Sequence, residues 1–108
     1  MNLKTTNLTS TPSLDALAEE KLLRPIKRLL AKDDKSADIL LDVEFGRTTH
    51  HHRKGEIWRA EAQLALPHRK WELRADAEGE SLEEAVNLVK SELLRRIKKY
   101  KEKSRIQG

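Results

Sequence analysis

Trp58-Arg59-Ala60-Glu61-Ala62-Gln63-Leu64-Ala65-Leu66 is the stretch that decides the fold, because every second side chain in it is apolar. Successive side chains of a β-strand point to opposite faces, so this alternation predicts a strand with one buried and one solvated face. Residues 37–45 and 71–78 repeat the pattern. The Thr48 to Glu56 loop and the Pro67-His68-Arg69 turn join the three stretches, which therefore predict an antiparallel meander.

A long amphipathic helix is predicted after these strands. Ser81 and Glu84 have the spacing of a capping box, in which both side chains satisfy free backbone N–H groups of the first turn. The helix is therefore expected to begin at Ser81. Apolar residues at spacings of three and four form one stripe that should face the core. They are Leu82, Val86, Val89, Leu93, Ile97 and Tyr100.

An earlier helix is predicted to begin at Thr11-Pro12, a favoured N-cap residue followed by the proline that suits the first helical position. Pro25 lies in its interior and should kink it near Lys21 and Leu22, because proline removes one backbone hydrogen bond. Residues 33–36 are expected to end it. Its apolar side consists of Leu14, Leu17, Ala18, Leu22, Pro25, Ile26, Leu29 and Leu30.

Residues 1–6 show a weak strand pattern, so the predicted order is β-α-β-β-β-α. Each helix has one apolar stripe and the sheet has one apolar face. We therefore expect an α+β fold of two layers, with two helices packed on one face of a four-stranded sheet. A chain of 108 residues is expected to form a single domain, 1–108.

Trp58 and Trp71 lie at apolar positions of the alternating strand pattern, so both are expected in the core.

The charge of the chain is concentrated near its end. The net charge of the chain is +4. Residues 90–105 hold eight basic and two acidic residues, a net charge of +6, so the rest of the chain has a net charge of −2. Basic residues near a helix end complement the macrodipole, but that effect covers only the last turn, whereas these run through about four turns. A solvated face without a partner is one interpretation. A surface that binds an anionic partner is the interpretation we favour.

Several classes of function have little support in the sequence. Only His50 and His52 of the His50-His51-His52 run could share a metal ion, and no carboxylate or cysteine adjoins them, so we expect no metal site. No nucleophile motif or phosphate-binding glycine loop is present, so we expect neither enzymatic activity nor a cofactor. The absence of cysteine, of a signal peptide and of an apolar run of about 20 residues predicts a cytoplasmic protein without membrane contact.

Residues 48–61, Thr48-Thr49-His50-His51-His52-Arg53-Lys54-Gly55-Glu56-Ile57-Trp58-Arg59-Ala60-Glu61, resemble the middle hairpin of the ribosome hibernation-promoting factor and ribosome-associated inhibitor family. That hairpin carries a similar His-His-x-Lys-Gly loop before an Arg-Ala-Glu strand. Residues 8–12 and 75–80 resemble the family's entries to its two helices, and residues 95–101 its basic ending. The joint order spans nearly the whole chain and implies the same β-α-β-β-β-α fold.

The resemblance implies binding to the small ribosomal subunit, through 16S rRNA and neighbouring ribosomal proteins. The implied location is the channel between head and body where messenger RNA and the A- and P-site transfer RNAs run. A bound copy would stop an idle ribosome from translating under stress or in stationary phase. The residues implied to face rRNA are Arg95, Lys98, Lys99 and Lys101 of the second helix, Lys21, Arg24, Lys27 and Arg28 of the first, and His51, His52, Arg53 and Lys54 of the middle loop.

Two positions depart from the family pattern: Glu83 replaces a frequent aromatic residue and Glu92 a frequent lysine. The resemblance also implies a short form without the separate C-terminal domain that pairs ribosomes, and a monomer when free. A general double-stranded-RNA-binding module is the alternative, because a sheet backed by two helices with a basic surface also binds duplexes by shape. A protein-interaction module is a third class, expected to bind with little salt dependence.

Overall fold

The computed structural model describes residues 1–30, 39–49, 56–66 and 71–107, and it confirms the predicted α+β fold and element order. Strand β1 (Asn2–Thr6) precedes a helical segment of three parts, and strands and a long helix follow. The helical segment comprises α1 (Pro12–Ala18), the π-helical turn η1 (Glu19–Leu23) and α2 (Arg24–Leu30). The remaining elements are β2 (Leu40–Thr49), β3 (Glu56–Leu66), β4 (Trp71–Gly79) and α3 (Leu82–Gln107).

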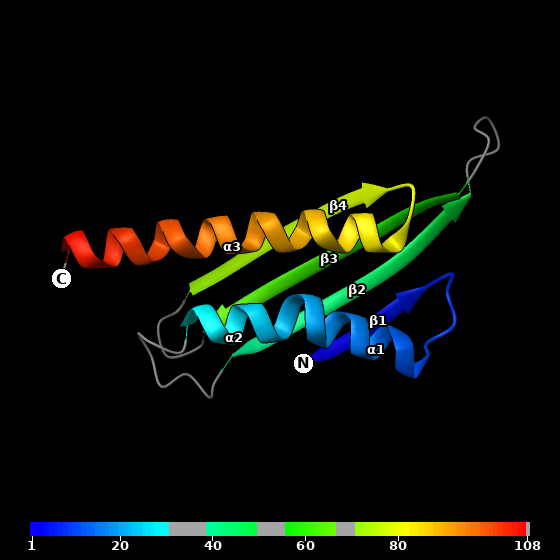
Figure 1. Cartoon of the computed structure of the whole chain (residues 1–108), viewed down its shortest axis with the longest axis horizontal. Coiled ribbons are helices and arrows are strands. Elements are labelled where there is room, and N and C mark those ends of the chain that lie inside the picture. The colour runs from blue at the N-terminus through cyan, green and yellow to red at the C-terminus, as the bar shows by residue number, and fades with distance from the viewer. Residues whose placement is uncertain (31–38, 50–55, 67–70, 108) are drawn as a thin grey trace.

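The four strands form one sheet in the order β1-β2-β3-β4. β1 is parallel to β2, and β2, β3 and β4 form the predicted antiparallel meander. Both helical segments cover the same face of this sheet (Figure 1). Because β1 and β4 run in the same direction and each is followed by a helix that runs back along the sheet, the two helical segments are parallel. Their C-terminal ends therefore lie at the same end of the molecule (Figure 1).

The core lies between the sheet and the helices. Phe45 of β2 and Ala60, Ala62 and Leu64 of β3 are 0% exposed, as the period-two pattern predicts. The predicted stripe of α3 is confirmed in its middle, where Val86, Val89, Leu93 and Ile97 are fully buried. At its ends, Leu82 and Tyr100 are only half-buried. One continuous hydrophobic cluster thus holds both helical segments against the sheet.

Both predicted helix starts are confirmed. The Thr11 hydroxyl accepts a hydrogen bond from the backbone N–H of Leu14 at 3.3 Å, and the Ser81 hydroxyl accepts one from the N–H of Glu84 at 3.1 Å. Each satisfies a donor that the first helical turn leaves free. Asn7 has a positive φ of 57°, a conformation that asparagine tolerates, where the chain turns from β1 toward the helix.

Pro25 distorts the first helical segment where the sequence predicts it. Proline cannot donate a backbone hydrogen bond to the residue four positions earlier, Lys21. The turn before it widens into η1, and the N–H of Arg24 donates to the carbonyl of Glu19, five residues back. A π-helical turn is one of the recognised causes of helix bending. The segment nevertheless keeps Leu22 and Ile26 in the core, each 1% exposed.

The structure corrects the prediction for Trp58, which is half-buried and lies outside the fully buried core. β2 continues to Thr49 and β3 begins at Glu56, both beyond the predicted limits, and Trp58 lies near this end of the sheet, opposite Gly79, the last residue of β4. The guanidinium of Arg47, its partner on β2, lies 5.7 Å from the indole centroid. A cation therefore lies over the ring.

Other predictions fall on parts of the chain that are not described. The side chain of Trp71 is outside the described set, as are residues 50–55 of the middle loop and residues 67–70 of the second turn. The same holds for residues 33–36, which were expected to end the first helix. α2 ends at Leu30.

Replacing Phe45 with alanine should lower the free energy of unfolding by about 3–5 kcal/mol, because a fully buried aromatic side chain leaves a cavity. Trp58→Ala should cost distinctly less, because the indole is only half-buried in the wild type. Urea unfolding of the two variants and the wild type measures both losses. If both substitutions lower the free energy of unfolding equally, Trp58 is as fully buried as Phe45.

Candidate nucleic-acid interface

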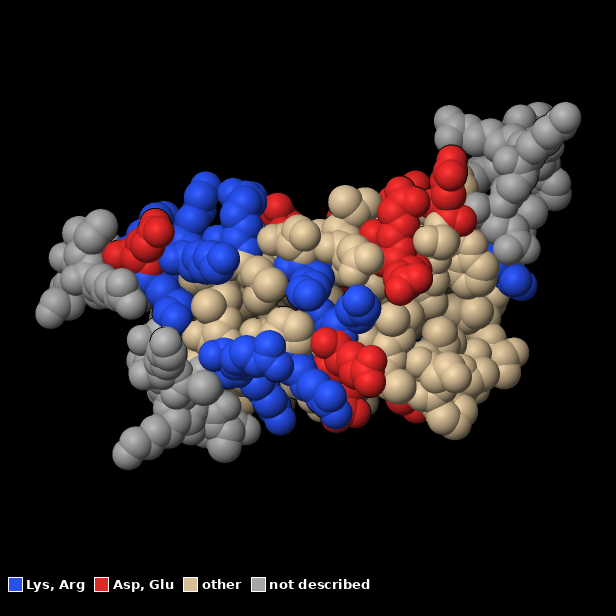
Figure 2. Space-filling view, viewed as in Figure 1, with Lys and Arg blue, Asp and Glu red and all other residues tan. Residues whose placement is uncertain are grey.

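Basic side chains of both helical segments gather at one end of the helical layer. Because the two helical segments are parallel, the basic residues of the first segment lie beside the basic half of α3 (Figure 2). Acidic side chains lie over the first turns of α3, toward the other end of the molecule. We call this set the basic cluster. It consists of Lys21 of η1, Arg24, Lys27 and Arg28 of α2, and Arg95, Arg96, Lys98, Lys99 and Lys101 of α3.

Most of the basic cluster is available to an incoming anion. Arg24, Lys27, Arg28, Lys98 and Lys99 are exposed, and within the described ranges none of them has a hydrogen bond or an ion pair. Lys21 is half-buried. Lysine and arginine side chains without acidic partners are the groups that bind phosphates and release counterions from RNA.

Lys101 has a structural contact as well. Its Nζ atom donates a hydrogen bond to the backbone carbonyl of Leu29 of α2 at 2.9 Å. Lys101 lies beyond Ile97, the last fully buried residue of α3 among the described side chains. The bond therefore holds the projecting end of α3 beside α2.

Glu92 neutralises part of the basic cluster. Its Oε1 accepts from Arg95 Nη2 at 2.7 Å and from Arg96 Nε at 2.8 Å, and its Oε2 accepts from Arg95 Nε at 3.2 Å. These hydrogen bonds, first from Arg95 and then from Arg96, lower the pKa of Glu92 to about 2. A group with a lowered pKa loses its stabilising contribution only as the pH falls through that value. The carboxylate of Glu92 is therefore ionised at neutral pH.

Arg96 also connects α3 to the edge of the sheet. Its Nη1 donates to the backbone carbonyl of Arg74 on β4 at 2.8 Å. β4 is an edge strand, so this bond satisfies a carbonyl without a partner strand. The identity of this acceptor required the tertiary structure.

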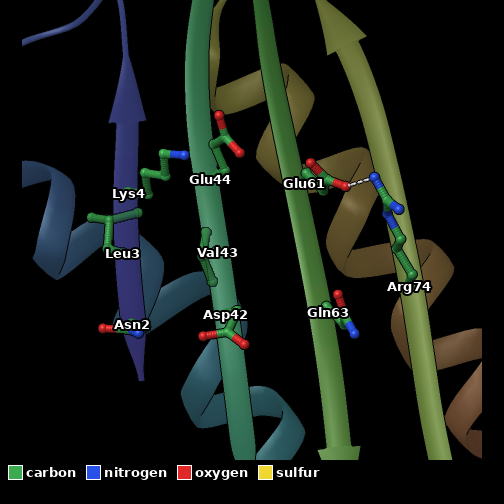
Figure 3. Close-up of a pocket in the computed structure, with 9 residues that line it drawn as sticks. All are labelled: Asn2, Leu3, Lys4, Asp42, Val43, Glu44, Glu61, Gln63 and Arg74. Atoms are coloured by element: carbon green, nitrogen blue, oxygen red, sulfur yellow. Dashed lines mark ion pairs between the residues drawn. The ribbon is translucent and has the colours of Figure 1, made fainter.

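The opposite face of the sheet is unsuited to a polyanion. A shallow pocket of about 440 Å³ lies there, and Asp42, Glu44 and Glu61 project around it with only Lys4 and Arg74 as cations (Figure 3). Arg74 is paired with Glu61, and on the same strands Arg59 is paired with Asp76 at 3.1 Å. Electrostatics therefore favours the helical face over the sheet face for RNA.

Some predicted site residues cannot be placed. His51, His52, Arg53 and Lys54 lie outside the described residues, so their part in the surface stays a prediction. Among the residues that the structure describes, no group of three or more His, Cys, Asp or Glu side chains is arranged to hold a metal ion. No helix in the described ranges has the length and apolar character needed to cross a membrane.

The fold and the charged surface together define a class: a two-layer β-α-β-β-β-α protein with a basic helical face. The family model described as "Sigma 54 modulation protein / S30EA ribosomal protein" matches residues 1–105. The chain therefore belongs to this family of ribosome-associated proteins, which confirms the family resemblance.

Two solved structures share the fold. The N-terminal domain of Protein Y from Thermus thermophilus is 24% identical, with a TM-score of 0.62 over 93% of this chain and 99% of that one. A ribosomal subunit interface protein from Coxiella burnetii is 21% identical, with a TM-score of 0.61 over 94% of this chain and 98% of that one. No curated protein sequence gave a significant match.

Replacing Lys101 with methionine should lower the free energy of unfolding by about 1–2 kcal/mol, because the carbonyl of Leu29 loses a charged hydrogen-bond donor. Lys99→Met is the matched control, since Lys99 is exposed and has no partner among the described residues. Urea unfolding should show a loss for the first variant and almost none for the second. An unchanged Lys101→Met variant would mean that this bond does not hold α3 against α2.

Proposed function

We propose that this protein binds the small ribosomal subunit and inhibits translation by occupying the channel used by messenger RNA and transfer RNA. The observation that carries the proposal is the convergence of exposed basic side chains from two parallel helical segments, in a chain of a ribosome-associated family. The Coxiella burnetii structure of the same fold is named for the ribosomal subunit interface. The proposed setting is the cytoplasm of an idle or stressed cell.

The binding mechanism is electrostatic. Arg24, Lys27 and Arg28 on one helix and Lys98 and Lys99 on the other present charges that neutralise 16S rRNA phosphates, and their rigid helices fix the spacing between the charges. The acidic sheet face would turn away from rRNA. Inhibition then needs no chemical step: the bound protein excludes the substrates of translation from their channel.

A double-stranded-RNA-binding module is the second candidate, and the same basic cluster supports it. The two candidates differ in the ligand they require. A channel-binding protein sediments with 30S or 70S particles and binds free duplexes weakly, whereas a general module binds isolated duplexes as tightly as ribosomes. Sucrose-gradient sedimentation and a duplex-binding titration distinguish them.

Binding to ribosomes should fall by roughly 10³-fold between about 50 and 200 mM salt if about six phosphates are contacted. Lys98→Glu/Lys99→Glu should weaken binding at least about 100-fold, because four units of charge change within the basic cluster, and should leave the unfolding curve in place. Cosedimentation with purified 30S subunits measures the affinity at each salt concentration.

Matched single variants control for net charge in that experiment. Lys98→Glu and Lys4→Glu change the charge equally but on the helical and sheet faces, respectively. Only Lys98→Glu should weaken binding strongly. Equal effects of the two substitutions, or a flat salt titration, would contradict binding through the helical face.

Messenger RNA with P-site transfer RNA should exclude the protein from the same 30S subunit. Competition at equilibrium is reciprocal, so each ligand must weaken the other by the same factor. Inhibition of translation should accordingly fade on ribosomes that carry both RNAs before the protein is added. Stable binding to elongating polysomes with occupied P sites would overturn the channel mechanism while leaving ribosome binding intact.

A further inference from the structure

Two adjacent arginines of α3, Arg95 and Arg96, converge on the carboxylate of Glu92, one turn earlier in the helix. Both donors of the Arg95 fork, Nε and Nη2, bond the two oxygens of Glu92 at 3.2 and 2.7 Å, and Nε of Arg96 bonds Oε1 at 2.8 Å. Guanidinium groups bind phosphate oxygens with the same bidentate geometry that they use for carboxylates. Glu92 therefore occupies the position that a phosphate group would take between these two side chains.

One of the two arginines would keep its position without Glu92. Arg96 is held independently, since its Nη1 atom bonds the carbonyl of Arg74 on β4 at 2.8 Å. The guanidinium group of Arg96 therefore does not need Glu92 to keep its orientation. A group that is held in advance loses little conformational entropy when it binds a ligand.

The site is accessible, and its present occupant can be displaced. The side chains of Arg95, Arg96 and Glu92 are 53%, 44% and 34% exposed. Ion pairs at such exposure contribute little net free energy because water screens them. A phosphate of a polyanion held nearby by Lys98 and Lys99 would compete for the same donors at high local concentration.

We propose that Arg95 and Arg96 form a phosphate-binding subsite of the basic cluster, and that the carboxylate of Glu92 occupies this subsite in the free protein and lowers its affinity for RNA. The inference rests on the proposed function and adds a determinant of its strength. In this proposal Glu92 is an anion that competes with RNA phosphate for the two arginines. Its position in a basic helix would by itself indicate only a stabilising ion pair.

Glu92→Gln tests the proposal with RNA. The amide keeps the size of the side chain but removes its charge, so affinity for 30S subunits should rise about fivefold at low salt, the factor for one unit-charge interaction at about 4 Å in water. The salt dependence should also steepen by about 0.7–0.9 for each phosphate newly contacted. Cosedimentation with 30S subunits across a salt series gives both quantities.

Glu102→Gln is the matched control. Glu102 lies in the same basic segment, is exposed, and has no hydrogen bond or ion pair with the described residues. The substitution therefore makes the same change in net charge without touching either arginine. If Glu102→Gln raises affinity as much as Glu92→Gln does, the effect is a general one of net charge and the subsite is refuted.

A double-mutant cycle identifies the donors. In an Arg95→Gln background, Glu92→Gln should raise affinity less than about twofold, because part of the subsite is gone. An unchanged fivefold gain would show that Glu92 acts without Arg95 and would overturn the proposal. Arg96 is left in place in this cycle because it also holds the edge of β4.

Inorganic phosphate tests the subsite without the ribosome. In a titration followed by NMR, the Nε–H signals of Arg95 and Arg96 should shift at lower phosphate concentration in Glu92→Gln than in the wild type. Equal titration curves would overturn the subsite even if ribosome binding stands. The expected phosphate shift in a protein that does not bind 30S subunits would instead refute the proposed function and leave the subsite supported.

Discussion

The structure depends on the burial of a single apolar face of one sheet. Only one side of β2, β3 and β4 carries the residues that exclude water, so both helical segments must pack on that side. Each segment follows a strand that runs in the same direction, and each returns along the sheet, so the two are parallel. The same constraint leaves the opposite face solvated, where acidic side chains outnumber basic ones around a shallow pocket. A molecule with chemically distinct faces follows directly from this packing.

Parallel helices bring like charges together, and the structure compensates for this in two ways. Lys101 donates a hydrogen bond to the carbonyl of Leu29, which connects α3 to α2. Glu92 draws Arg95 and Arg96 together, and Arg96 also satisfies the exposed edge of β4. These contacts restrain part of the basic cluster, whereas Lys98, Lys99 and the cations of α2 stay exposed for a ligand. Basic residues of similar appearance in the sequence therefore have different functions in the folded protein.

Local rules accounted for most of the fold. Period-two alternation located three strands, and capping residues such as Thr11 and Ser81 located both helix starts, because these signals depend on groups within a few residues of each other. The prediction failed for Trp58, whose phase on β3 is correct but whose burial depends on the packing around it in the tertiary structure. Alternation reports which face a side chain is on, and it contains no information about how far the covering layer extends.

The sequence alone determined the α+β class, the element order, the two amphipathic helices and the surplus of basic residues near the C-terminal end, since each follows from local periodicity or composition. Only the tertiary structure decided that the two basic segments meet at one end, because their separation in space depends on strand direction. It also decided which cations are engaged, since the carbonyl of Leu29 is 72 residues from Lys101 and that of Arg74 is 22 residues from Arg96. Contacts across such distances in sequence are set by packing, and no local pattern encodes them.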